Sequence, residues 1–411
     1  MRLLYLATHE PWPLNTGARL RDYHLARELA RRATVTFAGV RNEGDAESPE
    51  PPAEAAFERV VMLTKEPSYT TGKIVRGMIG PVPVTVLNFW SQKMRGQIES
   101  LLREGSFDSV QIEGVHFAPY IDLIREAASR PALIADWHNI ESEVMWRYAE
   151  KASMARKIVA RRTAALIERT ERQLLQAADI CTVVSRRECD EVRNTFGGRN
   201  VAVIPNGVDA AAHSEAEIRA AALRFPVPVE APYLLFVGSM DYHANIDGVD
   251  WFVTSVWPAL SKRVSGLKLV IAGRDPAPRI QALQSPEVIV TGTVQDVRPY
   301  YLRASAVIVP LRVASGTRLK ILEAMAAGVP VVSTRMGAEG IEATSGKDIL
   351  LADTERDLAE SVETLLKNRP LAESIAAAAR ELVRTKYDWS LLGEQLFAIH
   401  SESASRRRAN G

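Results

Sequence analysis

Residues 315–340 read S-G-T-R-L-K-I-L-E-A-M-A-A-G-V-P-V-V-S-T-R-M-G-A-E-G, and this stretch decides the kind of fold the chain adopts. An apolar strand at 306–311 precedes it, a glycine-containing loop opens a helix, and the apolar run V-P-V-V-S-T follows. The first N–H groups of a helix have no partners within the helix, and they form the positive end of its dipole. This order of elements therefore predicts an anion site at the helix start.

The side chains of this helix divide it into two faces. Lys320 and Glu323 are three residues apart and share one face. Leu319 and Leu322 line another face at helical spacing, and Arg318 adds a second cation at the helix start. We expect the polar face to border a cleft and to hold a nucleoside diphosphate, with its ribose hydroxyls at the carboxylate. The alternative is a surface Lys-Glu pair on an ordinary amphipathic helix.

Composition sets the class of protein. A chain of 411 residues is too long for one compact core and predicts two domains. Charged residues make up 25% and the net charge is +1, a soluble globular profile with no general attraction to nucleic acid. Two cysteines support neither a disulfide framework nor a zinc site, so we expect a cytoplasmic protein. No apolar run is long enough to predict a signal peptide or a membrane span.

Two series of apolar strands alternate with helical segments, which predicts two parallel sheets covered on both faces. The first series starts at residues 2–8 and continues near 35, 108, 132 and 179. The second follows a proline-punctuated segment at 206–232 with no strand pattern, which we interpret as a linker. It contains Y-L-L-F-V-G, L-K-L-V-I-A-G, E-V-I-V-T-G, A-V-I-V-P-L, V-P-V-V-S-T and D-I-L-L-A. A last helix is expected from about residue 389.

Ligands of open parallel sheets bind beyond the carboxyl ends of the strands, where the loops gather. With two such sheets, the expected site is the cleft between them. Glycines follow several strands, and Gly17 and Gly238 leave room for backbone N–H groups to approach a phosphate. Gly273 is followed by R-D-P, which lacks the spacing of a dinucleotide fingerprint and disfavours a nicotinamide cofactor.

Several motifs together resemble a known family. I-P-N-G-V-D at 204–209, L-F-V-G-S-M at 235–240 and L-E-A-M-A-A-G-V-P-V-V at 322–332 resemble the retaining glycosyltransferases of family four. P-L-N-T-G-A-R-L-R-D-Y-H-L and D-W-H-N-I-E-S-E resemble a bacterial branch associated with surface polysaccharides. The resemblance implies an α/β fold called GT-B, two Rossmann-like, doubly wound parallel-sheet domains that face a cleft.

The resemblance also implies a division of the chain. Residues 1–205 would form the acceptor domain and residues 206–388 the sugar-nucleotide domain. Residues 389–411 would form a C-terminal helix and a frayed tail, with the helix packing against either domain, the N-terminal one included. The implied reaction moves a sugar from a nucleotide-diphosphate sugar to a glycan or lipid-linked acceptor with retention, by front-side attack. It would serve cell-surface or exopolysaccharide biosynthesis, with no cofactor and no metal, and the chain has no Asp-x-Asp triplet.

The family pattern assigns the donor site. Of its two glutamates, the second matches Glu323 and would bind the ribose, whereas the first position holds Ser315. Ser239 and Ala244 stand where the family commonly has an Arg and a Lys for the leaving diphosphate. We expect Arg318 and Lys320 to replace that pair, because the departing anion needs positive charge. His243 and Arg274 are the other candidates. The full set of expected donor-binding residues is Gly17, Asn206, Gly238, Ser315, Gly316, Thr317 and Glu323.

On the N-terminal side, the polar residues of D-W-H-N-I-E cluster after the strand near 132. The resemblance implies that His138 hydrogen-bonds the donor sugar and that Asn139 or Glu141 addresses the acceptor. Arg21 on the first helix is expected to assist with the acceptor. A capping or core role is the alternative for His138, and a solvated position is the alternative for Arg21.

Two stretches mix apolar and basic residues, at 73–95 and 151–167, and predict a peripheral contact with anionic membrane lipid. Ordinary solvated faces are the alternative. Two other functions remain open at this point. The missing charges at Ser239, Ala244 and Ser315 favour a catalytically inactive GT-B protein that binds a nucleotide or glycan for a partner complex. The fold also supports the use of phosphate or a phosphorylated sugar.

Overall fold

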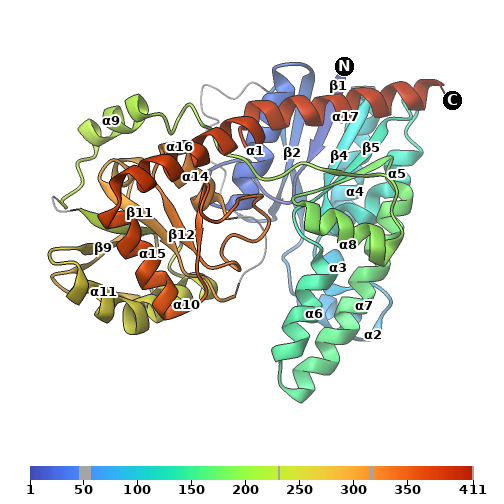
Figure 1. Cartoon of the computed structure of the whole chain (residues 1–411). Helices are drawn as coiled ribbons and strands as arrows, with labels where there is room; N and C mark the ends of the chain where they lie inside the picture. Colours follow the sequence, from blue (N-terminus) through green and yellow to red (C-terminus); the bar gives the residue numbers. More distant parts are fainter. Residues whose placement is uncertain (46–56, 230–231, 314–317, 410–411) are drawn as a thin grey trace. The chain divides into compact units, whose positions relative to one another are not determined.

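A computed structural model describes residues 1–45, 57–229, 232–313 and 318–409 (Figure 1). The chain forms two compact units, Met1–Pro205 with Leu392–Gly411, here called the N-terminal domain, and Asn206–Leu391, here called the C-terminal domain. The division after Pro205 coincides with the expected boundary. None of the helices in the described ranges has the length and apolarity that crossing a bilayer requires.

The N-terminal domain is built on a seven-stranded sheet in the order β3-β2-β1-β4-β5-β6-β7, with every neighbouring pair parallel. The central strands are buried along their whole length, as parallel strands covered on both faces should be. The strands are β1 Arg2–Leu6, β2 Thr34–Asn42, β3 Arg59–Lys65, β4 Ser109–Glu113, β5 Ala132–Trp137, β6 Ile180–Val183 and β7 Val201–Val203. The helices are α1 Gly17–Ala30, α2 Thr71–Ile79, α3 Val84–Leu87, α4 Gln92–Gly105, η1 Gly114–Tyr120, α5 Ile121–Arg125, α6 Glu141–Lys151, α7 Met154–Ala177 and α8 Arg186–Phe196.

The last helix, α17 (Trp389–Ala409), packs on the N-terminal domain from Leu392 onward. His400 is fully buried, with Nε2 2.8 Å from Gln111 Oε1 and Nδ1 2.8 Å from Ser109 Oγ on β4. Burial lowers the pKa of His400 to about 3, so the imidazole stays neutral. Its two ring nitrogens connect α17 to β4 by hydrogen bonds. The C-terminal helix of the chain therefore packs against the sheet whose first strand begins at residue 2.

The C-terminal domain is built on a six-stranded parallel sheet in the order β10-β9-β8-β11-β12-β13. Its strands are β8 Tyr233–Val237, β9 Lys268–Ala272, β10 Val288–Gly292, β11 Ala304–Val309, β12 Val331–Ser333 and β13 Leu350–Leu351. Its helices are α9 Glu215–Arg224, α10 His243–Trp251, η2 Phe252–Val256, α11 Trp257–Arg263, α12 Pro278–Gln281, α13 Arg298–Tyr301, α14 Leu319–Ala327, α15 Glu355–Lys367 and α16 Arg369–Lys386. Of the expected strand D-I-L-L-A, only the two residues of edge strand β13 are in a strand.

The segment interpreted as a linker contains helix α9. The Ser214 hydroxyl accepts a hydrogen bond from Glu217 N at its start, which is the Ser-x-x-Glu spacing of a capping box. Ile218 and Ala221 bury one face of the helix. The prolines flank this helix and do not interrupt it, so their number alone was a misleading signal.

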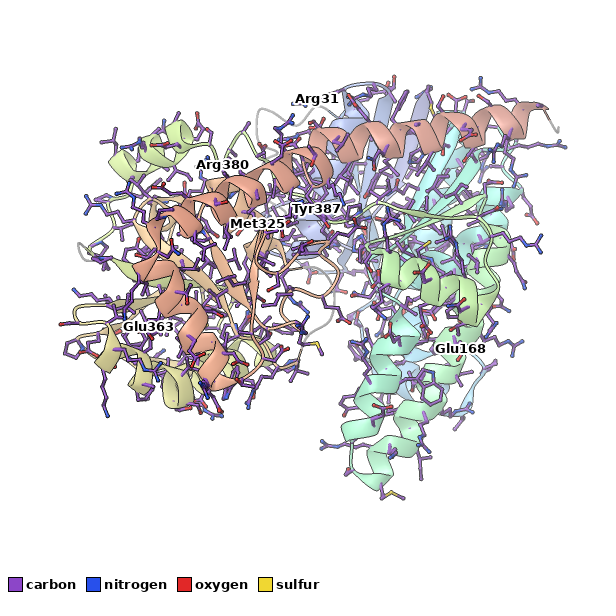
Figure 2. All side chains as sticks on the ribbon, viewed as in Figure 1. Arg31, Glu168, Met325, Glu363, Arg380 and Tyr387 are labelled. Atoms are coloured by element: carbon purple, nitrogen blue, oxygen red, sulfur yellow. The ribbon has the colours of Figure 1, made fainter. Side chains whose placement is uncertain are left out.

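Helix α14 is fixed at its C-terminal end. Met325 points into the core, and Gly328 ends the helix in the left-handed conformation (φ 73°) that glycine adopts without strain. Arg380 of α16 donates from Nη2 to Ala327 O at 3.2 Å, which satisfies one of the unpaired carbonyls there (Figure 2). These contacts fix the C-terminal end of α14. The charged residues Arg318 and Lys320 lie at its other end.

Candidate active site

Arg318 and Lys320 lie together at the start of α14. Arg318 is the residue before the first helical turn and Lys320 is in that turn, so both cations lie closer to the helix start than the sequence indicated. Within the described residues, Arg318 at the N-cap position makes no side-chain capping hydrogen bond. Expected donor residues Ser315, Gly316 and Thr317 lie outside the described residues.

Arg318 is half-buried as a residue and carries two buried guanidinium nitrogens. Its Nε and Nη2 atoms are shielded from solvent and form no hydrogen bond within the described parts of the chain. Burial lowers the pKa of Arg318, and Tyr242 and Glu339 offset this only in part. A buried cation with unused donors is costly, and binding an anion would remove that cost.

Lys320 is held by neutral groups. Its Nζ donates to Asn245 Oδ1 at 2.9 Å and lies 4.1 Å from the centre of the Phe236 ring. Burial, together with the charge of Arg318, lowers the pKa of Lys320 to about 7, while Glu323 acts in the opposite direction. The site therefore carries positive charge that is unstable without an anion, the opposite of a surface Lys-Glu pair.

Glu323 lies one turn further along α14 and accepts a hydrogen bond from the Tyr301 hydroxyl at 3.2 Å. Burial first, and then Glu323, raise the pKa of Tyr301 well above its usual value. Tyr301 thus orients one carboxylate oxygen, and sequence reasoning did not identify this tyrosine. The ribose role of Glu323 stays a prediction.

A guanidinium from beyond the neighbouring strand lies beside Ser239, the position where the family pattern has an arginine. Arg274, just beyond β9, donates from Nε to Ser239 Oγ at 3.0 Å. Ser239 O accepts from Asn245 Nδ2 at 2.8 Å, and Asn245 Oδ1 accepts from Lys320. These hydrogen bonds connect Arg274 to Lys320 through two neutral residues. Ala244 is buried in α10 and contributes no charge.

Gly238 leaves the space that this arrangement needs. A Cβ atom at Gly238 would lie 2.7 Å from Lys320 Nζ and 2.8 Å from Asn245 Nδ2. A Cβ atom at Gly273 would lie 1.7 Å from Gly238 O, so the ends of β8 and β9 approach closely. Both glycines are therefore required by the packing around the cations.

Two other expected donor residues lie apart from this cluster in the sequence. Asn206 is half-buried in the first segment of the C-terminal domain. Gly17 is exposed at the first position of α1, where the Thr16 hydroxyl accepts from Arg19 N at 3.3 Å. Their contacts with a donor stay predictions.

A second group of charges gathers in the N-terminal domain, where β1, β4 and β5 end. His138 follows β5 and approaches three carboxylates. Its Nε2 lies 3.3 Å from Asp22 Oδ1 and 3.3 Å from Asp136 Oδ2, and its Nδ1 lies 3.4 Å from Glu113 Oε1. Burial alone would lower the pKa of His138, but these carboxylates raise it well above 6.5. The three carboxylates therefore favour the cationic form of the imidazole.

His9 occupies a similar position after β1. Its Nε2 lies 3.4 Å from Asp22 Oδ2 and its Nδ1 lies 3.5 Å from Glu113 Oε2. Thr8 donates to Glu113 Oε2 through both its N–H and its hydroxyl, each at 2.6 Å. Burial would raise the pKa of Glu113, but the two histidines hold it well below its usual range. Burial and the nearby Glu113 raise the pKa of Asp22.

Sequence reasoning missed His9, Asp22 and Glu113, although a signal for two of them existed. His9 and Glu113 each follow or end an apolar strand, and such positions gather at one edge of a parallel sheet. Asp22 has no such signal, because it lies inside α1 and only the packing of that helix turns it inward.

The expected contact between Arg21 and the acceptor does not fit the structure. Arg21 is only 1% exposed, and its Nε and Nη2 donate to Asp136 at 2.9 and 2.7 Å. Its Nη1 donates to Pro205 O at 3.0 Å, and Thr182 Oγ1 donates to Asp136 at 2.6 Å. Arg21 therefore orients Asp136 from within the domain. It could reach an acceptor only if its hydrogen bonds to Asp136 were broken.

These side chains form two groups whose ligand atoms lie within 4.8 Å of one another, as a metal site requires. The groups are His9, Asp22 and Glu113, and Asp22, Asp136 and His138. With both histidines protonated, however, Arg21 completes three cations against three carboxylates. The cluster is thus balanced by its own side chains, and a divalent cation would have to displace the two protons.

His138, Asn139 and Glu141 line one small pocket together with Glu113 and Glu171. The structure thus brings together three of the expected site residues. Glu171 of α7 accepts from Ser142 N at 3.2 Å, and burial raises its pKa to about 7. Glu171 lies far along the chain from the D-W-H-N-I-E motif, so no sequence signal connected them.

Comparison with known proteins follows the same division. Residues 17–212 match the family model described as Glycosyltransferase Family 4, and residues 231–368 match the one described as Glycosyl transferases group 1. A GDP-mannose-dependent alpha-(1-6)-phosphatidylinositol monomannoside mannosyltransferase of Mycobacterium tuberculosis is 26% identical over 245 residues, 55% of this chain and 62% of that protein. The chain spans about half the length of the curated relatives it matches first.

Solved structures share the architecture over nearly the whole chain. Sucrose-phosphate synthase from Thermosynechococcus elongatus is 17% identical with a TM-score of 0.73, covering 98% of this chain and 99% of that one. Anabaena Alr3699/HepE in complex with UDP is 16% identical with a TM-score of 0.66, covering 98% and 100%. The two family models and the shared two-domain α/β architecture show that this chain belongs to glycosyltransferase family four and has the GT-B fold.

Proposed function

We propose that the protein transfers a sugar from a nucleotide-diphosphate sugar to a glycan or lipid-linked acceptor with retention of anomeric configuration. The observation that carries this proposal lies at the start of α14, where two buried guanidinium nitrogens of Arg318, beside Lys320, have no partner among the described residues. The proposed role is cell-surface polysaccharide biosynthesis, in the cytoplasm, where the buried free thiols of Cys181 and Cys189 would stay reduced.

Breaking the bond between the sugar and the diphosphate leaves negative charge on the leaving group. Donors that are already in place where this charge develops lower the barrier most. Arg318 offers two unused N–H donors, the start of α14 offers backbone N–H groups, and a diphosphate would hold Lys320 in its charged form. Glu323, oriented by Tyr301, is proposed to accept from the ribose hydroxyls.

Arg274 completes the proposed diphosphate site. Its hydrogen bond to Ser239 brings a guanidinium to the end of β8, where the family commonly carries an arginine on that strand's own loop. On this proposal the positive charge that Ser239 lacks is supplied by Arg274, so the site does not lose it. This weakens the main sequence argument for an inactive binding protein.

The N-terminal cluster is proposed to serve the reacting sugar and the acceptor. Protonated His138 offers an N–H donor at the edge of the pocket that Asn139 and Glu141 also line. The buried carboxylates fix its charge and orientation, so it stays a donor throughout turnover. The transferred sugar keeps its configuration by front-side attack, in which the leaving diphosphate itself takes the proton of the acceptor hydroxyl.

The test is a panel of nucleoside diphosphates and their sugars, first by thermal shift and then by hydrolysis or transfer. A ligand that binds only the folded protein raises its melting temperature. We expect a nucleoside diphosphate to bind and the matching sugar nucleotide to be hydrolysed or transferred. Binding without any turnover would favour the inactive partner protein, and binding of phosphate sugars alone would favour a phosphorylase-type reaction.

A further inference from the structure

Two stretches that are separate in the sequence form one surface of the N-terminal domain. Helix α2 packs against α7, and Arg162 of α7 donates from Nε to Met78 O at 2.8 Å and from Nη2 to Gly80 O at 2.7 Å. The guanidinium thereby satisfies two carbonyls at the end of α2. The mixed apolar and basic segments at 73–95 and 151–167 are therefore neighbours in space.

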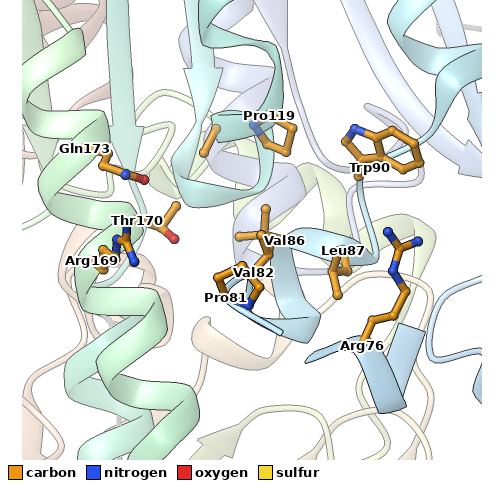
Figure 3. A pocket seen from close by; sticks show the side chains of 11 residues that line it. Arg76, Pro81, Val82, Val86, Leu87, Trp90, Pro119, Arg169, Thr170 and Gln173 are labelled. Carbon is orange, nitrogen blue, oxygen red and sulfur yellow. The ribbon is translucent and has the colours of Figure 1, made fainter. Parts of the chain in front are cut away.

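A pocket of about 460 Å³ opens between these helices (Figure 3). Its walls come from α2, α3 and the loops around them, from η1, and from α7. The lining residues are Arg76, Pro81, Val82, Val86, Leu87, Trp90, Ala118, Pro119, Arg169, Thr170 and Gln173. No acidic side chain is among them, and most of the wall is aliphatic, proline or indole. Such a pocket fits an apolar chain better than a sugar, which needs many hydrogen-bonding partners.

Two cations flank the pocket. Arg76 and Arg169 reach it from opposite sides, and both are exposed (Figure 3). Neither guanidinium forms an ion pair or a hydrogen bond within the described ranges, whereas Arg162 and Arg172 of α7 do. An apolar interior with unpaired positive charge at its mouth is complementary to an amphiphile whose head group is anionic.

Large apolar side chains are also exposed elsewhere on α2 and α7. Ile79 at the end of α2 is 79% exposed, and Met154 and Ile158 on the first turns of α7 are 77% and 68% exposed. Exposed basic residues, Arg156 and Arg161, alternate with them on α7. Large apolar groups that remain this exposed beside cations are typical of a surface that enters the interfacial region of a membrane.

We propose that this surface docks on an anionic membrane, with one lipid chain in the pocket and the lipid phosphate between Arg76 and Arg169. The membrane accounts for the exposed apolar side chains outside the pocket, which a ligand confined to the pocket would leave in water. The pocket adjoins the small pocket of His138, because η1 and neighbouring residues of α7 line both. The proposal does not depend on the catalytic assignment, since no lining residue belongs to that site.

The first experiment is co-sedimentation with vesicles of phosphatidylcholine alone or mixed equally with phosphatidylglycerol. We expect binding that depends on phosphatidylglycerol and that decreases with salt, because Arg76 and Arg169 provide a screened attraction. The double variants Ile79→Glu with Ile158→Glu and Arg76→Glu with Arg169→Glu should each lower partitioning by roughly tenfold or more. All four positions are exposed, so the variants should fold.

Matched controls separate this surface from general charge and hydrophobicity. Leu223 is 88% exposed on α9, and Arg103 is exposed on α4, away from the pocket. Leu223→Glu and Arg103→Glu should bind vesicles within about twofold of the parent, as expected when a charge lies outside the contact. Equal sedimentation with both vesicle types, or equal losses in these controls, would overturn the proposal.

A second measurement tests the pocket itself. Trp90 lines it, so bromine-labelled phosphatidylglycerol should quench tryptophan fluorescence, and Trp90→Phe should remove most of that quenching. Inorganic phosphate should not compete, because it lacks the chain. Quenching unchanged by Trp90→Phe would show that lipid does not enter the pocket. Sugar-nucleotide binding should be unaffected in every variant, so failure of docking is distinguishable from failure of the proposed transferase activity.

Discussion

The two groups of buried charge differ in how they are balanced. In the N-terminal domain, Arg21 and two histidines face three carboxylates at ion-pair distances, although His9 Nε2, Asp22 Oδ2 and His138 Nε2 form no hydrogen bond among the described residues. At the start of α14, Arg318 has no partner among the described residues and Lys320 has only a neutral one. A balanced cluster holds residues in position, whereas an unbalanced one is suited to a charged ligand. The difference separates a cluster whose charges fix the position of His138 from one whose charges are left for a ligand.

Breaking the balanced cluster should produce the largest effect, and it should be on stability. Arg21→Met leaves Asp136 buried with its strongest partner gone, which costs about 3–5 kcal/mol of unfolding free energy. Urea denaturation measures this loss. Arg335→Met is the control, because Arg335 pairs with Asp353 at an exposed site. If Arg21→Met lowered the unfolding free energy as little as the control does, the Arg21–Asp136 pair would not be what balances the cluster.

Removing charge from the unbalanced cluster should instead affect turnover. Arg318→Ala should lower kcat by about a hundredfold or more, as loss of a donor to a developing anion does, and should leave stability unchanged or improved. Arg335→Ala in the same domain should change neither. Single-turnover rates and urea denaturation together decide the matter. Near-parental turnover would remove Arg318 from the leaving-group site and favour Arg274.

The sheets and the domain boundary could be predicted because buried parallel strands leave a continuous apolar pattern. Arg318, Lys320 and Glu323 could be predicted because they share one motif at one helix start. Asp22, Glu171 and Tyr301 could not, because each joins its site only when a helix packs against the ends of distant strands. Arg21 was misassigned for a related reason, since an arginine on a first helical turn has no sequence mark of burial.

Glu323 provides a smaller test of the unbalanced cluster. Glu323→Gln keeps an acceptor for the Tyr301 hydroxyl but removes the charge, whereas Glu323→Ala removes both. If the carboxylate accepts from ribose hydroxyls, calorimetry should show nucleoside diphosphate binding weakened about tenfold in Glu323→Ala and less in Glu323→Gln. Tyr301→Phe tests the orienting contact and should have an intermediate effect. Equal affinity in all three variants would contradict the ribose role.

The remaining test of the unbalanced cluster is the pH dependence of binding. Without ligand, the pKa of Lys320 is about 7, and a diphosphate beside it should raise that pKa. The bound state then holds more protons than the free state above pH 7, so affinity should fall as pH rises from 7 to 8.5, by up to about tenfold per pH unit. Calorimetry in buffers of different ionisation enthalpy should show proton uptake at pH 8.

The variant Lys320→Met isolates this titration. Burial also raises the pKa values of Glu171 and Glu188 to about 7, but both belong to the N-terminal domain and remain in the variant. The probe should be a sugar nucleotide, whose diester phosphates do not titrate in this range. We expect Lys320→Met to bind more weakly at pH 7 and to lose both the pH dependence and the proton uptake. If proton uptake persists in the variant, the titrating group is not Lys320, and the positive charge that the unbalanced cluster offers at neutral pH comes from its arginines alone.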